Sequence, residues 1–260
     1  MFRTSGYILP ISIATLIALA TVVVLAIQPA NIWANWKPAT CLKTGCFCET
    51  SHTQSPIRQP ANTVSSLGFV FSGTIILFQM RQKEAARRLP AGYSAIMGIS
   101  SIMIGVGSAF YHASLTFIGQ FFDVFGMFLL AAFMLVYAWE RIWNLRLTTT
   151  LGLYLALNLF LSGLQIVIPD TRRYVFAIIL IVALLCEYYF HMKAKPQIEV
   201  RWMRYGISLL AVAYIIWILD NTHTICFEKS LFQGHAAWHI LGAVSVLYLY
   251  RYYASEANTI

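Results

Sequence analysis

Long unbroken apolar stretches, separated by short polar segments, dominate the chain from end to end. They fall at residues 8–27, 62–80, 93–117, 121–139, 151–168, 174–190, 205–219 and 235–250. Each is close to the roughly 20 residues that a helix needs to cross the hydrocarbon core of a bilayer. Because the apolar residues run continuously and do not alternate with polar ones, the pattern predicts helices rather than strands. We therefore predict eight membrane-crossing helices.

The composition supports the same class of protein. Of the 260 residues, 59% are hydrophobic and 11% are charged, whereas a soluble globular domain carries about 25% charged residues. A chain with so few charges does not cover a globular surface with hydrated groups. The sequence therefore predicts an all-α, polytopic membrane helix bundle, and it contains no internal repeat or separate soluble domain.

The 18 lysines and arginines are unevenly shared between alternate loops, which predicts an orientation. With the N-terminus in the cytoplasm, those inside are Arg3, Arg81, Lys83, Arg87, Arg88, Arg141, Arg146, Lys193, Lys195, Arg201, Arg204 and Arg251. Those outside are Lys37, Lys43, Arg58, Arg172, Arg173 and Lys229. Both termini are then cytoplasmic. Basic cytoplasmic loops beside anionic lipid explain the net charge of +8, and no nucleic-acid partner is expected.

The first apolar stretch, residues 8–27, has two interpretations. Arg3 supplies the positive start of a signal peptide, but the apolar core exceeds the usual length of about 7–15 residues and no A-x-A site follows. We interpret residues 1–30 as a retained transmembrane anchor or uncleaved signal, followed by a seven-helix membrane domain over residues 31–260. The short loops, without an ER-retrieval ending, favour a bacterial inner membrane.

Polar side chains inside the membrane spans are the strongest functional signal, because they are costly there. Ser108 and His112 are four residues apart and share one helix face, and Asp123 follows across a short outer turn. His235 and His239 open the last span with the same spacing, which lets two imidazoles bind one metal ion. The predicted topology places all five residues at the outer ends of their helices. The three histidines are therefore expected to converge at one depth.

Three histidine ligands leave the fourth position of a tetrahedral zinc ion open to water, which is the arrangement of a catalytic site. Zinc lowers the pKa of that water to about 7. Asp123 would then accept its proton, and Ser108 would donate a hydrogen bond to a developing oxyanion. Structural interpretations compete with this one. His112 alone suits a packing histidine bonded to a carbonyl, and Asp123 alone suits the start of a helix, where the dipole favours it.

Other polar residues in the spans carry weaker signals. Glu187 and His191 are four residues apart, and we interpret them as a pair at the membrane interface. Asp220 ends the seventh span on the outer side. It is either a partner of a ligating histidine or a cap of the following loop.

Four of the five cysteines lie in loops that are predicted to be outside, where disulfides persist. They are Cys41, Cys46, Cys48 and Cys226. Cys46 and Cys48 form a C-x-C pair, which is a weak zinc pattern without a second pair nearby. Cys186 lies inside a span and is interpreted as a packing residue.

These motifs resemble those of the alkaline ceramidases, a family in a superfamily of seven-helix membrane hydrolases that includes the adiponectin-receptor and Per1-like proteins. The resemblance is carried by GVGSAFYHASL, then QFFD, then HAAWH, in that order. The segment CFCETS, followed by PANTVSSLGF, is similar to the start of the family pattern. The resemblance covers residues 46–250, so the first span is an addition to a seven-helix core.

The resemblance implies an enzyme that hydrolyses the amide bond of ceramide-type membrane lipids to a sphingoid base and a fatty acid. It implies zinc ligands at His112, His235 and His239, and catalytic roles for Ser108 and Asp123. It also implies a disulfide between Cys48 and Cys226, and a second bridge between Cys41 and Cys46 would use the remaining loop cysteines.

The chain departs from the family at its calcium site. The aspartate, tryptophan, asparagine and later glutamate of the animal pattern are replaced by Cys46, Phe47, Ser51 and Gln59. Glu49 alone keeps its charge, whereas Ca²⁺ prefers several oxygen ligands that include carboxylates. We therefore expect an activity that does not depend on calcium, with Glu49 as the one carboxylate left for a weakly bound ion.

Other functions stay open at this point. One is a hydrolase of another N-acyl or ester lipid, because the motifs define metal chemistry and not the headgroup. Another is a seven-helix receptor with structural zinc, which has no need for Ser108 and Asp123. The third is a haem-binding electron carrier, which would use two histidines as axial ligands and leave one unused. The sequence makes no prediction of oligomeric state.

Overall fold

The computed structural model describes residues 5–43, 45–80, 89–195 and 197–256. In order, their α-helices are α1 (Ser5–Ala26), α2 (Pro60–Ser66), α3 (Gly68–Gln79), α4 (Ala91–Ser114), α5 (Phe117–Trp143), α6 (Leu147–Val167), α7 (Arg172–Ala194), α8 (Val200–Asn221) and α9 (Gly234–Ala254). Two short 3-10 helices, η1 (Thr40–Lys43) and η2 (Pro169–Thr171), lie in the loops. The described residues form no strand, so the predicted all-α class is confirmed.

The second predicted span, residues 62–80, is two helices in the structure. Pro60 opens α2, where its fixed φ suits the first helical position. Leu67 separates α2 from α3 but keeps a right-handed helical backbone, so the two helices form one nearly continuous rod. The other spans differ from the prediction by a few residues at each end. The largest extension is in α5, where the Thr116 side chain caps the helix by accepting a hydrogen bond from the Gly119 N–H at 3.2 Å.

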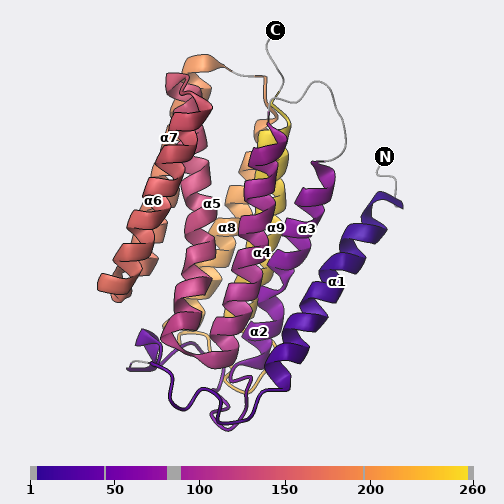
Figure 1. Cartoon of the computed structure of the whole chain (residues 1–260), viewed down its shortest axis with the longest axis vertical. Coiled ribbons are helices and arrows are strands. Elements are labelled where there is room, and N and C mark those ends of the chain that lie inside the picture. The colour runs from indigo at the N-terminus through magenta and orange to yellow at the C-terminus, as the bar shows by residue number, and fades with distance from the viewer. Residues whose placement is uncertain (1–4, 44, 81–88, 196, 257–260) are drawn as a thin grey trace.

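Seven helical rods of the described chain are long and apolar enough to cross a membrane: α1, the α2–α3 rod, and α4 to α8. The eighth predicted span, α9, has 21 residues but is less apolar, because histidines, a tryptophan and several tyrosines interrupt its sequence. In Figure 1, α9 nevertheless lies beside α8 and α4 in the middle of the bundle. We therefore describe it as an inner helix of a multi-pass membrane bundle.

Both ends of the described chain lie at one end of the bundle, because α1 starts and α9 finishes there (Figure 1). This agrees with an even number of passes. The placement of that end in the cytoplasm stays a prediction. That prediction rests on the basic residues of the loops. Five of them lie outside the described residues: Arg3, Arg81, Lys83, Arg87 and Arg88.

The helices divide into inner and outer ones. More than half of the apolar stretch is buried in the α2–α3 rod, α4 and α5, whereas about a fifth is buried in α1, α6, α7 and α8. Contacts within the bundle join α4 to α5 and α3, α8 to α9, and α5 to α7 and α6. The outer helices therefore present apolar side chains that suit lipid.

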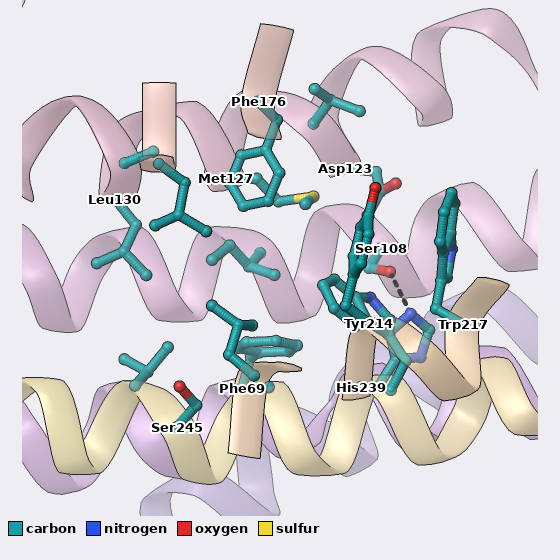
Figure 2. A pocket seen from close by; sticks show the side chains of 18 of the residues that line it. Phe69, Ser108, Asp123, Met127, Leu130, Phe176, Tyr214, Trp217, His239 and Ser245 are labelled. Atoms are coloured by element: carbon teal, nitrogen blue, oxygen red, sulfur yellow. Dashed lines mark hydrogen bonds between the residues drawn. The ribbon is translucent and has the colours of Figure 1, made fainter. Parts of the chain in front are cut away.

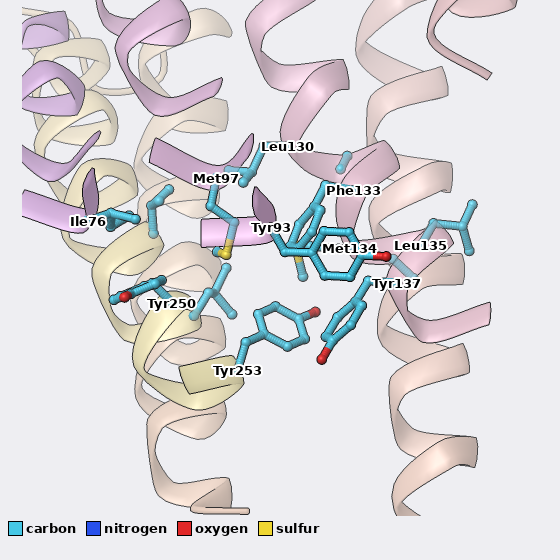
Figure 3. Packing of buried hydrophobic residues seen from close by; sticks show 14 of the residues in the cluster. Ile76, Tyr93, Met97, Leu130, Phe133, Met134, Leu135, Tyr137, Tyr250 and Tyr253 are labelled. Atoms are coloured by element: carbon cyan, nitrogen blue, oxygen red, sulfur yellow. The ribbon is translucent and has the colours of Figure 1, made fainter. Parts of the chain in front are cut away.

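Aromatic rings fill the end of the bundle at which α1 starts and α9 finishes. Tyr93, Phe133, Tyr137 and Tyr253 come from α4, α5 and α9 and contact one another in stacked and edge-on pairs (Figure 3). Such rings fill the space between helices with few rotatable bonds. They join α4, α5 and α9 at this end of the bundle.

A buried ion-pair network joins helices at the same end. Arg141 of α5 pairs with Glu187 of α7 and, at 3.2 Å, with Glu256 after α9. The Tyr252 hydroxyl donates to Glu187 at 2.7 Å. The interpretation of Glu187 and His191 as a pair is therefore wrong. A buried carboxylate needs a full ionic partner, and the arginine of a neighbouring helix supplies one.

Glycines bring α4 and α5 into backbone contact. A Cβ atom on Gly107 would lie 2.6 Å from the Phe122 carbonyl oxygen, and one on Gly126 would lie 2.6 Å from the Ile104 nitrogen. Small residues of this kind let membrane helices approach closely. As a result, Ser108, which follows Gly107, lies next to the turn of α5 that carries Asp123.

We predict that Gly107→Ala destabilises the bundle, because the added methyl group overlaps a backbone carbonyl that cannot move independently of its helix. Overpacking of this kind costs about 1–3 kcal/mol. The unfolding temperature in detergent should fall by several degrees. Gly152→Ala on α6 is the matched control, since an added Cβ there meets no atom within 4 Å. Equal unfolding temperatures for the two variants would contradict the proposed close contact.

Candidate active site

Three histidines meet at the loop-rich end of the bundle. His112 lies in the last turn of α4, and His235 and His239 lie in the first two turns of α9. Their candidate ligand atoms all lie within 4.8 Å of one another, and each side chain is buried. The structure therefore brings together the three residues that the i, i+4 pair and the predicted topology pointed to.

A chain of hydrogen bonds fixes the ring orientation of His112. The Gln59 side-chain nitrogen donates to the Glu49 backbone carbonyl at 3.1 Å, so the Gln59 oxygen is the atom that faces His112 Nδ1, at 2.9 Å. An amide oxygen only accepts, which places the histidine proton on Nδ1. The lone pair of His112 Nε2 is then left for the centre of the cluster.

The same logic orients His239. The Ser65 hydroxyl donates to the Asn62 carbonyl at 3.1 Å and lies 2.9 Å from His239 Nδ1. A hydroxyl has one proton, so Ser65 accepts from Nδ1 and the lone pair of His239 is on Nε2. That nitrogen is 3.3 Å from the Ser108 hydroxyl, as drawn in Figure 2.

These atoms fit a shared metal ion. His112 Nε2 lies 3.1 Å from His235 Nε2, and His235 Nδ1 is buried without a hydrogen-bond partner among the described residues. Zinc bonded to imidazole nitrogens at about 2.0–2.1 Å in a tetrahedron would hold them about 3.3 Å apart. Facing acceptor atoms at this spacing repel each other unless a cation or a proton lies between them. Three imidazoles suit zinc, and also copper, iron and nickel.

Two disulfides fasten the loop that covers the histidines. Cys41 is bonded to Cys46, and Cys48 to Cys226, which joins the loop before α2 to the loop before α9. These are the pairs expected from the sequence. Cys186 on α7 is free and partly buried, in agreement with a packing role.

Phe47 lies between the two disulfides and covers the histidines. Its ring centroid is 4.0 Å from that of His235 and 5.1 Å from that of His112. Its backbone has a φ of 140°, which is unfavourable for any residue except glycine. The bridged cysteines on both sides hold this conformation. Sequence reasoning noted Phe47 only as a replacement for tryptophan and missed its position over the site.

Two carboxylates support the backbone around the histidines. Asp220 accepts from the His235 N–H at 3.1 Å and from the Cys48 N–H at 3.3 Å. It therefore bonds the backbone of one of the histidines and not its ring, and it joins the start of α9 to the loop that carries Cys48. Glu49 accepts from the Ala61 and Asn62 N–H groups at 2.7 and 2.8 Å. Burial raises the pKa of Glu49, although these two hydrogen bonds oppose the change.

Glu49 and Gln59 together occupy the region where the family pattern places calcium ligands. Both oxygens of the Glu49 carboxylate already accept backbone N–H groups at the start of α2, and Gln59 is used on His112. No sequence signal revealed the contact of Gln59 with His112, because the two residues are 53 positions apart.

Ser108 and Asp123 face a cavity between α4, α5, α7, α8 and α9. Figure 2 shows them at one end of it, with His239 and Trp217, while Met127 and Leu130 lie farther along an apolar wall. Asp123 lies in the second turn of α5, which begins at Phe117. The alternative that Asp123 merely starts a helix is therefore wrong.

The comparisons with known proteins agree with this arrangement. The family model described as Ceramidase matches residues 44–257, which leaves α1 outside the match. The alkaline ceramidase of Arabidopsis thaliana is 25% identical over 216 residues, which cover 81% of each chain. The alkaline ceramidase of Drosophila melanogaster is 26% identical over 242 residues, or 88% of this chain and 83% of that protein.

Both of these relatives are eukaryotic, so they give no support to the expected bacterial inner membrane. The family match spans the histidine cluster, Ser108, Asp123 and the disulfide between Cys48 and Cys226. On this match, which covers most of its length, the chain belongs to the ceramidase family.

Proposed function

We propose that this protein is a zinc-dependent hydrolase that cleaves the amide bond of ceramide-type lipids within the membrane. The products are a sphingoid base and a fatty acid. One observation carries the proposal: three buried histidines lie together, and two of them line the same largely apolar cavity as Ser108 and Asp123. The family supports ceramide as the substrate, since the relatives are alkaline ceramidases.

The cavity suits a lipid with a polar amide and a long acyl chain. Ser108, Asp123 and His239 lie at one end of it. Its apolar wall is built from residues such as Phe69, Met127, Leu130 and Leu180. The acyl chain would lie along this wall, with the amide carbon beside Ser108 and Asp123. We also propose that residues 1–30 form an anchor, that both termini are cytoplasmic, and that the site faces the other side.

His112, His235 and His239 would hold the zinc ion. When bound, zinc supplies a Lewis acid for the amide oxygen and lowers the pKa of a water molecule in its open position. Asp123 accepts a proton from the attacking water as the new C–O bond forms, and Ser108 donates a hydrogen bond to the former carbonyl oxygen. The C–N bond then breaks as Asp123 returns the proton to the leaving nitrogen. One water molecule is consumed.

We predict one zinc ion per chain in the purified protein. Replacement of His112, His235 or His239 by alanine should remove most of the bound zinc, because two imidazoles do not complete the site. His52→Ala is the matched control, as His52 is exposed in a nearby loop. The measurement is metal content by mass spectrometry. Full zinc retention in a triple-alanine variant would exclude this site.

The proton-transfer roles predict different losses for two variants. Asp123→Asn should keep zinc and lose about 10²–10⁴ in turnover, because an amide cannot accept the proton of water. Ser108→Ala should lose less, near the lower end of the about 10²–10³ that an oxyanion donor contributes. The assay is mass spectrometry of the sphingoid base released from ceramide. Asp170→Asn, an exposed loop change, is the control. An Asp123→Asn variant as fast as the parent would remove this carboxylate from the mechanism.

We further predict that hydrolysis does not depend on calcium. Gln59 replaces a glutamate of the family's calcium pattern, and its side chain bonds His112 instead. Removal of calcium with a chelator selective over zinc should leave activity and zinc content unchanged. Gln59→Ala should lower zinc affinity about 10–100-fold, as expected for loss of a hydrogen bond that orients a ligand. Gln54→Ala, exposed in the same loop, is the control.

Two results would contradict this prediction. A several-fold rise in activity when micromolar calcium is added back would show a working calcium site. Unchanged zinc affinity in Gln59→Ala would show that the contact with His112 does not orient the ligand.

A further inference from the structure

A tyrosine lies beside the histidine cluster on the wall of the same cavity. Tyr111 directly precedes His112 in α4, and it lines the cavity together with Ser108 and Asp123. It is only 2% exposed. Ser108 and Tyr111 are three residues apart, so their side chains are neighbours on one helix face, with about 5–6 Å between Cβ atoms. The proposed hydrolysis gives this tyrosine no role.

The Tyr111 hydroxyl lies between Arg172 and the loop that covers the histidines. Arg172, which also lines the cavity, donates a hydrogen bond to the Tyr111 oxygen. On the other side, the hydroxyl is 3.0 Å from Cys41 Sγ. Cys41 is bonded to Cys46, so its sulfur carries no proton and Tyr111 is the donor. The tyrosine oxygen is therefore well paired, whereas its proton is held only by sulfur, which is a weak acceptor.

The charges around this hydroxyl are balanced within the fold. Asp123 interacts electrostatically with both Arg172 and Arg173. Arg172 Nη1 also donates to the Thr40 hydroxyl at 2.9 Å and to the Pro169 carbonyl at 2.8 Å. The two arginines therefore have partners in the protein, and this end of the cavity suits a neutral headgroup. Ser108 and Asp123 lie at the same end (Figure 2).

We propose that Tyr111 is a specificity-determining residue, which donates its hydroxyl proton to a hydroxyl group on the headgroup of the lipid. This rests on the proposed amide hydrolysis and narrows its substrate class to N-acyl lipids that carry a hydroxyl group next to the amide.

Ceramide has the chemistry that this donor requires. It carries a hydroxyl group on each carbon that flanks the one bearing the amide nitrogen, so both hydroxyls are a few bonds from the amide carbon beside Ser108. A hydroxyl oxygen is a stronger acceptor than a disulfide sulfur. Binding of the lipid therefore replaces the weak hydrogen bond to Cys41 by a stronger one, while Arg172 keeps the tyrosine oxygen occupied.

The test compares three lipids with the same acyl chain in detergent micelles: ceramide, an analogue that lacks the primary hydroxyl, and an analogue that lacks the secondary hydroxyl. A site that hydrogen-bonds a substrate hydroxyl discriminates against the analogue without it. For the zinc-loaded parent, kcat/KM should fall about ten-fold when the contacted hydroxyl is removed. Tyr111→Phe should lower kcat/KM on ceramide by a similar factor and leave that analogue little changed. The two analogues identify which hydroxyl is bound.

Tyr174→Phe is the matched control, because Tyr174 lies in the first turn of α7 and is 72% exposed. It should leave all three rates unchanged. The zinc content of Tyr111→Phe should equal that of the parent. The proposal is overturned if the parent cleaves the three lipids equally well. It is also overturned if Tyr111→Phe lowers all three rates by the same factor, as expected for a purely structural contact with Cys41.

A binding measurement separates this proposal from the proposed hydrolysis. The same lipids compete with a fluorescent N-acyl lipid for the zinc-loaded Asp123→Asn variant, with and without Tyr111→Phe. Tighter binding of ceramide than of one analogue, with the difference lost in the double variant, supports the subsite even if no lipid is cleaved. If no lipid is cleaved and all three bind equally, the subsite is overturned. Cleavage of all three lipids with equal kcat/KM would overturn the subsite and leave the proposed function intact.

Discussion

The cost of placing polar groups inside an apolar bundle governs the polar end of this protein. Imidazoles, hydroxyls and carboxylates are stable there only when their hydrogen-bonding atoms find partners. For two of the three histidines the structure meets this requirement with a short series of bonds, from Glu49 through Gln59 to His112 and from Asn62 through Ser65 to His239. Each bond satisfies a buried atom and also fixes the direction of a ring. The hydrogen bonds that offset the free-energy cost of burying these groups therefore also orient the histidine rings.

The rest of the molecule keeps these bonds in place. Backbone contact between α4 and α5 at Gly107 sets the separation of Ser108 and Asp123. The disulfide between Cys48 and Cys226 ties the covering loop to the segment that precedes α9. At the other end, the Arg141 network and the tyrosine cluster join α5, α7 and α9. The site thus lies where several helix ends meet, and contacts between the helices themselves join them at the other end.

A neutral side chain, Gln59, stands at a position where the animal family pattern has a glutamate. Gln59 reaches the histidine directly, and this one hydrogen bond orients the ring. Arg172 and Arg173 add positive charge to the lining of the cavity that Ser108 and Asp123 face.

Much of the fold was predictable from the sequence, because a bilayer allows few arrangements of the backbone. Unbroken apolar stretches could only be helices, and the i, i+4 histidines of α9 with His112 indicated a shared metal site before any contact was known. The break at Leu67 and the exact helix ends were not predictable, since they depend on local caps and packing.

Which side chains contact one another was decided by the tertiary structure alone. Glu187 pairs with Arg141 and not with His191, Phe47 covers two histidines, and Gln59 orients one of them. These contacts join residues far apart in the chain, and no local pattern records them. Sequence fixes which residues share a helix face because that follows from the helical repeat. Which faces meet depends on the packing of all the helices together.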